Sequence, residues 1–171
     1  RIFTPDQYVK QAEALKIVMM AAHSRNIIEL AKPTKVYKNL IHVNSKGGIE
    51  DFSWAASFLE TAVQLQAVSD GDAFNPKMAA TKLWLAELLN KTLGLVDPTP
   101  FLSNQDEFSD RGNFDNSAQY KTAKTTAFYN LLGQFETAFF PKTPLTRRDV
   151  ATAAAKILQL PVLSGGVATH V

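Results

Sequence analysis

The stretch FFPKTPLTRRDVATAAAKIL, residues 139–158, decides how this chain is expected to fold. Its aromatic-x-Pro start favours an extended backbone, because the residue before a proline is pushed out of the helical region. Thr146 follows five residues after the proline, and Asp149 stands three positions later, as in a near capping box. Apolar residues then recur every three or four positions. The stretch therefore predicts an extended segment that leads into a capped helix.

The same pattern occurs twice more, as FTPDQYVKQAEALKIVMMA at residues 3–21 and FNPKMAATKLWLAELLNKT at residues 74–92. The three segments align on their Phe-x-Pro pairs, which begin at Phe3, Phe74 and Phe139, without a gap. Such self-similarity predicts a repeat architecture. Each segment is expected to contribute one equivalent unit.

A second helical pattern precedes the later two segments, opening at Trp54 in one case and at Tyr120 in the other. An aromatic-x-Asn/Asp pair stands before each of these helices. The pairs are Tyr37/Asn39 and Phe108/Asp110. A full repeat therefore reads as an aromatic-x-Asp pair, a loop, an aromatic-led helix, a turn, Phe-x-Pro and a capped helix.

This order of motifs resembles the S-layer homology (SLH) domain family, whose repeats also carry a Trp-Ala helix opening and a Thr-Arg-Ala-Glu-type helix start. The resemblance implies an all-α fold, a pseudo-threefold helical bundle of tandem two-helix SLH repeats with the first repeat incomplete. It implies the second half of repeat 1 at residues 1–31, repeat 2 at 32–95, repeat 3 at 96–160 and a C-terminal tail at 161–171. Because the sequence has no initiator Met, the chain is expected to be a fragment or a processed product. The leading helix of repeat 1 is expected to have been removed upstream of Arg1, to be supplied by a self-assembly or envelope protein partner, or to be absent from an incomplete variant of the bundle.

Composition excludes several classes of protein. The 171 residues contain no cysteine, which rules out a disulfide scaffold and a thiol nucleophile. The three histidines have no metal-ligand spacing, and no nucleophile elbow, phosphate loop or zinc-protease motif occurs, so no cofactor and no enzymatic activity are expected. A net charge of +2 does not by itself imply a nucleic-acid partner. No apolar run is long enough to predict a membrane span.

The SLH resemblance implies that grooves between repeats bind a secondary cell-wall polysaccharide that often carries a pyruvate ketal. An arginine fork suits the ketal carboxylate, an aromatic ring suits the apolar face of a sugar, and short polar groups suit hydroxyls. The residues that match the motif, or stand in its place, are Thr146, Arg147 and Asp149; Thr81, Lys82 and Trp84; and Gln11 and Glu13, together with Trp54. Only repeat 3 keeps the arginine, so its groove is the best equipped.

Each of these residues also has a purely structural interpretation. Thr146 and Asp149 would cap a helix whether or not anything binds there. Arg147 at a helix N-terminus, where the helix dipole disfavours a cation, indicates an anion nearby, which is either a ligand or an Asp or Glu of the protein. Trp54 is expected to be a core plug rather than a sugar platform, and Trp84 is either core edge or groove wall. Asp106 and Glu107 are expected to lie on a solvated surface.

The leading functional prediction is a non-catalytic, extracellular anchoring module in the cell wall or S-layer of a prokaryote. The first alternative is a structural module that joins subunits of a surface layer, pilus or envelope complex and whose glycan grooves have degenerated. A helix-turn-helix DNA-binding domain is a weaker alternative, suggested by Arg147 and Arg148 at the start of a helix. A direct comparison of Arg147→Lys with Lys82→Arg in glycan binding is expected to separate the first two.

Overall fold

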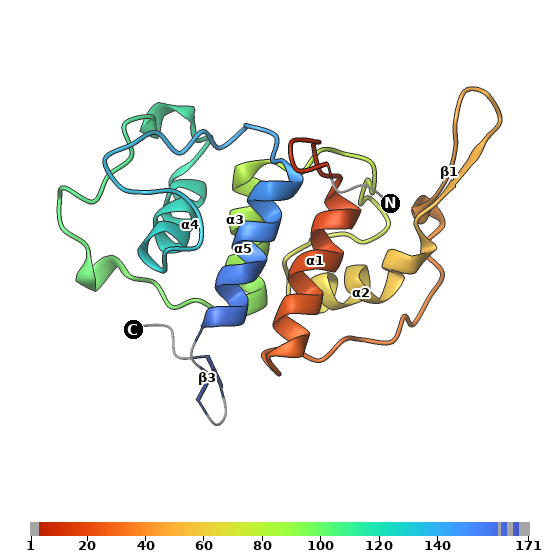
Figure 1. The fold of residues 1–171 in the computed structure, drawn as a ribbon, viewed down its shortest axis with the longest axis horizontal. Helices are drawn as coiled ribbons and strands as arrows, with labels where there is room; N and C mark the ends of the chain where they lie inside the picture. The colour runs from red at the N-terminus through yellow and green to blue at the C-terminus, as the bar shows by residue number, and fades with distance from the viewer. Residues whose placement is uncertain (1–3, 161, 164–165, 168–171) are drawn as a thin grey trace.

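The computed structural model describes residues 4–160, 162–163 and 166–167, so Phe3 and most of the predicted tail lie outside the described part. Five α-helices dominate it: α1 (Gln11–Ser24), α2 (Ala56–Gln64), α3 (Lys82–Leu93), α4 (Ser117–Phe128) and α5 (Arg147–Gln159). Helix α1 packs against α2, α3 and α5, and α3 also packs against α4. Figure 1 shows α1, α3 and α5 in the middle of the molecule, with α2 to one side and α4 to the other.

The predicted all-α fold class, with its pseudo-threefold bundle of two-helix repeats, is wrong. Strands β1 (Ile41–Val43) and β2 (Ile49–Asp51) pair antiparallel in a hairpin that projects from the molecule (Figure 1). A second antiparallel pair joins β3 (Val162–Leu163) to β4 (Gly166–Val167). The first hairpin forms because β-branched residues flank a tight turn at Asn44, whose side-chain oxygen accepts the N–H groups of Lys46 and Gly48. The chain is a helix-rich mixed structure.

The three Phe-x-Pro segments bond to one another through their backbones in a closed cycle. The N–H of Val9 donates to the carbonyl of Leu145, that of Leu145 to Ala80, and that of Ala80 to Val9, at 3.0, 2.8 and 2.9 Å. The next turns repeat the pattern, because the N–H groups of Gln11, Lys82 and Arg147 donate to the carbonyls of Met78, Thr143 and Gln7. The side chains of Val9, Ala80 and Leu145 are buried at this junction. The starts of α1, α3 and α5 are thereby tied together.

Most of the predicted helix starts are confirmed. The Thr81 hydroxyl accepts the N–H of Trp84 at the start of α3. Thr146 and Asp149 form a reciprocal capping box at the start of α5. The prediction that Tyr120 opens a helix is wrong by one turn, because Asn116 accepts the N–H of Gln119 and starts α4 at Ser117. Trp54 lies in a short 3-10 turn, η2 (Ser53–Ala55), that leads into α2.

Candidate functional site

The helix starts, defined here as residues 10–13, 81–84 and 146–149, hold most of the side chains for which a glycan role was predicted. Arg147 is only 20% exposed, and its guanidinium lies 3.6 Å from the Glu13 carboxylate and 3.2 Å from the Thr4 hydroxyl. The anion expected near Arg147 is thus a carboxylate of the protein itself. Arg148 faces Asp6 at 3.2 Å, so both arginines on which the DNA-binding alternative depends have internal partners.

Lys82 holds the place in the second segment that Arg147 holds in the third. Its amine lies over the ring of Phe139, 4.6 Å from the centroid. Burial lowers the pKa of Lys82, and the charges of Asp149 and Asp110 partly oppose that shift. Gln11, at the matching place in the first segment, is buried. These three side chains therefore help to close the molecule where the segments meet.

The two tryptophans differ in their surroundings. Trp84 is partly buried and packs against the core, as one of its two interpretations predicted. Trp54 is 43% exposed, so its prediction as a core plug is wrong. Its ring lies beside Phe52 and under the amine of Lys16, which is 5.4 Å from the ring centroid.

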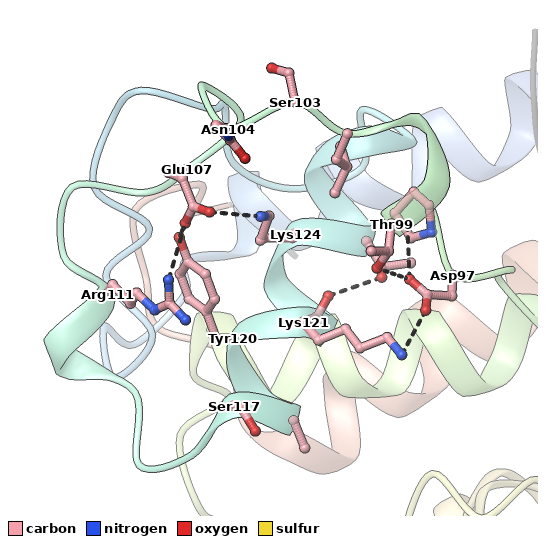
Figure 2. Close-up of a pocket in the computed structure, with 14 residues that line it drawn as sticks. Asp97, Thr99, Ser103, Asn104, Glu107, Arg111, Ser117, Tyr120, Lys121 and Lys124 are labelled. Carbon is pink, nitrogen blue, oxygen red and sulfur yellow. Dashed lines mark hydrogen bonds and ion pairs between the residues drawn. The ribbon is translucent and has the colours of Figure 1, made fainter.

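A cavity of about 560 Å³ lined by several charged side chains lies away from the helix starts, between the loop of residues 97–111 and helix α4 (Figure 2). Glu107 is its hub. The Glu107 carboxylate accepts hydrogen bonds from the Tyr120 hydroxyl and from the Lys124 amine, the latter at 3.1 Å. These two bonds, the tyrosine's first, hold the pKa of Glu107 below its usual value against the effect of burial. The prediction of a merely solvated Glu107 is therefore wrong.

A second carboxylate lines the other end of the same cavity. Asp97 accepts hydrogen bonds from Lys121 at 2.7 Å and from the N–H and hydroxyl of Thr99 at 3.0 and 2.6 Å. These bonds, the lysine's first, lower the pKa of Asp97 to about 2. Both carboxylates are thus ionised at neutral pH and fixed in place.

Arg111 is the least engaged cation of the cavity. It comes from a one-turn 3-10 helix, η4 (Arg111–Asn113), and its side chain is 68% exposed. The guanidinium stacks on the Tyr120 ring at 4.8 Å and lies 3.8 Å from Glu107, which is beyond hydrogen-bond distance. Its fork therefore keeps donors for a ligand. Figure 2 shows it beside Tyr120 at the edge of the cavity.

The lining as a whole carries three cations, Arg111, Lys121 and Lys124, against the carboxylates Asp97 and Glu107. Ser103, Asn104 and Ser117 add hydroxyl and amide groups. No histidine lines the cavity, and among the described residues no cluster of His, Asp and Glu could hold a metal ion. The excess of positive charge in this lining suits the carboxylate of an acidic sugar, and the hydroxyl and amide groups suit its hydroxyls.

Sequence reasoning missed this cavity because its parts come from a loop and from a helix with few apolar residues. The one available signal was the Phe108/Asp110 pair, which marks the loop that carries Glu107 and Arg111.

No protein-family model matches the chain, and no curated protein matches it. In the part of the chain that the structure describes, no helix is long and apolar enough to cross a membrane.

Proposed function

We propose that this chain is a non-catalytic module that binds an acidic cell-wall polysaccharide and so anchors at the surface of a prokaryotic cell. The observation that carries the proposal is the 68% exposed Arg111 guanidinium in the lining of this cavity, held by Glu107 only at 3.8 Å. A carboxylate, such as that of a pyruvate ketal, can accept two parallel hydrogen bonds from a guanidinium. The order of motifs that resembles SLH repeats supports the same class of ligand.

The proposal moves the binding site away from the helix starts. Arg147 already faces Glu13, so a glycan carboxylate would have to displace an internal partner there. Arg111 also pairs with Glu107, at 3.8 Å, but its side chain is 68% exposed against 20% for Arg147, and Lys124 would still neutralise Glu107 if Arg111 turned to a ligand. Hydroxyls of the sugar would then meet Ser103, Asn104 and Ser117.

The test is calorimetric titration of the protein with purified wall polysaccharide, with and without its carboxylate substituents. We expect the wild type to bind only the acidic form and Arg111→Ala to bind it about tenfold more weakly, because hydrogen bonds between charged groups are worth about 1.5–3 kcal/mol. Arg148→Ala is the matched control, since Arg148 is 65% exposed and lies outside the cavity. Absence of binding, or equal losses in the two variants, would contradict the proposal.

One observation favours the alternative of a subunit-joining module. Paired residues and residues two apart share a face of a hairpin, so Ile41, Val43 and Ile49 lie together, and all three are exposed. An exposed apolar face on a projecting hairpin is typical of an association surface. Sedimentation of the wild type and Ile49→Lys tests this alternative. A concentration-dependent dimer that the substitution abolishes would support it, and a monomeric wild type at 100 μM or so would exclude it.

A further inference from the structure

A second cavity, of about 460 Å³, is also lined by residues of η4. Arg111 lines the first cavity and Gly112, its neighbour in the chain, lines the second. The two cavities therefore share one short helical turn, and we call this turn the η4 ridge. The second cavity is lined by Gly112, Asn113, Asp115, Phe140, Pro141, Lys142, Thr143 and Pro144.

Phe140 has an unusual backbone for an aromatic residue. Its φ is 57°, in the left-handed region, and its side chain is 58% exposed. A non-glycine residue pays about 1–2 kcal/mol for this conformation. Since so much of the ring is left in water, burial of Phe140 returns little of that cost. Backbone strain at an exposed aromatic residue is a feature that functional positions often share.

Asp110 holds Phe140 in this conformation. Its carboxylate accepts the N–H of Phe139 and the N–H of Phe140, both at 2.8 Å. Burial opposes ionisation of Asp110, but these two bonds, together with those from its own N–H and from Asn113, keep the pKa of the carboxyl below its usual value. The ionised group can only accept, so the peptide between Phe139 and Phe140 must turn its N–H toward it.

The second segment shows what happens without the carboxylate. Asn39 stands where Asp110 stands, in the aromatic-x-Asn/Asp pair, and its amide donates to the carbonyl of Phe74 at 2.7 Å. The peptide that joins Phe74 to Asn75 is thus turned the opposite way, and Asn75 does not share the positive φ. The difference between acid and amide at this position thus accompanies the opposite orientation of the peptide and the outward aromatic residue of the third segment.

We infer that Phe140 is a platform on which a hexose ring of the bound polysaccharide stacks. The negative face of an aromatic ring attracts the polarised C–H groups on the apolar face of a sugar. Asp115 and Lys142 line the same cavity, and although they pair with each other at 3.4 Å, their side chains are 66% and 75% exposed and can also bond sugar hydroxyls. This inference rests on the proposed function, because it places a neutral sugar of the same chain one unit beyond the acidic sugar at Arg111.

The main test compares Phe140→Gly with the wild type on two ligands, the polysaccharide and a single pyruvylated monosaccharide. We expect the substitution to weaken polysaccharide binding about fivefold to tenfold and to leave the monosaccharide unaffected, because only the longer ligand reaches the platform. Glycine adopts a positive φ without strain, so thermal stability should be equal or higher. Asn75→Gly, at the equivalent place in the second segment, is the control and should bind as the wild type does.

Asp110→Asn provides an independent test of the positioning role. Its amide can donate to the carbonyl of Phe139, as Asn39 does to Phe74, and should turn the ring away, with a loss of polysaccharide affinity like that of Phe140→Gly. Wild-type affinity in a folded Phe140→Gly, combined with weak binding by Arg111→Ala, would overturn the platform and leave the proposed function standing.

A titration with neutral sugars tests the Phe140 platform independently of the acidic ligand. Methyl hexosides at millimolar concentration should shift the ring resonances of Phe140 in the wild-type NMR spectrum. Unshifted resonances would overturn the platform, whatever the polysaccharide does. If the methyl hexosides shift these resonances but the polysaccharide does not bind, the platform survives and the proposed function fails.

Discussion

The helix starts and the η4 ridge both hold basic residues, and they use them differently. At the helix starts two of the cations turn inward, Arg147 to Glu13 and Lys82 to the ring of Phe139. At the ridge, Arg111 stays exposed beside a cavity, and Phe140 is held outward beside the second cavity. The comparison teaches that equivalent places in the repeated segments serve different ends: the helix starts join the three segments, whereas Arg111 and Phe140, next to and within repeated motifs, stay exposed beside cavities.

The largest expected effect concerns the junction of the three segments. Leu145 is buried, and its backbone N–H donates to Ala80 in the closed cycle. Leu145→Ala should lower the free energy of unfolding by about 2–4 kcal/mol, the usual cost of removing a buried leucine side chain. Urea unfolding followed by circular dichroism measures this free energy. Phe140→Gly, beside the η4 ridge, is the control, and its change in the free energy of unfolding should be close to zero. A loss below about 1 kcal/mol would show that the junction does not hold the molecule together.

An intermediate effect is expected at the Arg147–Glu13 pair. Arg147→Ala should cost about 1–2 kcal/mol of stability because it leaves a partly buried carboxylate without its partner. Glu13→Gln should cost less, and the double variant should show coupling between the two sites. Polysaccharide affinity of the folded Arg147→Ala protein should equal that of the wild type. A loss of affinity with unchanged stability would return the glycan site to the helix starts.

The smallest effect is expected at Lys82. Because burial lowers its pKa in the folded state, the charged amine costs stability at neutral pH. That cost disappears as the pH rises from the lowered pKa of Lys82 in the folded state toward its usual value of about 10.5, reached in the unfolded chain. Over this alkaline range Lys82 therefore makes the wild type more stable as the pH rises. Lys82→Met, which keeps the stem over Phe139, should be at least as stable at pH 7 and should lack the alkaline gain. If Lys82→Met is less stable than the wild type at pH 7, the buried charge of Lys82 does not cost stability, and the prediction is wrong.

Local signals were enough for the parts of the fold that are locally determined. Thr81 and Thr146 cap their helices as predicted, because a cap needs only a hydroxyl at the right spacing. The hairpin at β1 and β2 escaped notice because three-residue strands give little periodicity to read. Its presence makes the expected all-α class wrong.

The candidate site could be predicted less well because its chemistry depends on tertiary pairing. Nothing local tells whether Arg147 faces a glycan or Glu13, 134 positions away in the sequence. The identity of Asp110 was visible in the aromatic-x-Asn/Asp pair. Its consequence for the backbone of Phe140 requires both the loop and the third Phe-x-Pro segment in place. The difference between Asn39 and Asp110, at the same place in the two aromatic-x-Asn/Asp pairs, is the sequence feature that could have pointed to it.

Backbone NMR of the wild-type protein during titration with acidic wall polysaccharide tests the contrast between the two regions most directly. We expect the largest chemical-shift changes at residues 111–115, which include the η4 ridge, and at residues 140–144, which line the second cavity beside it. The amides of residues 81–84 and 146–149 should stay nearly unchanged. Changes concentrated at those helix starts, with a silent ridge, would contradict the account.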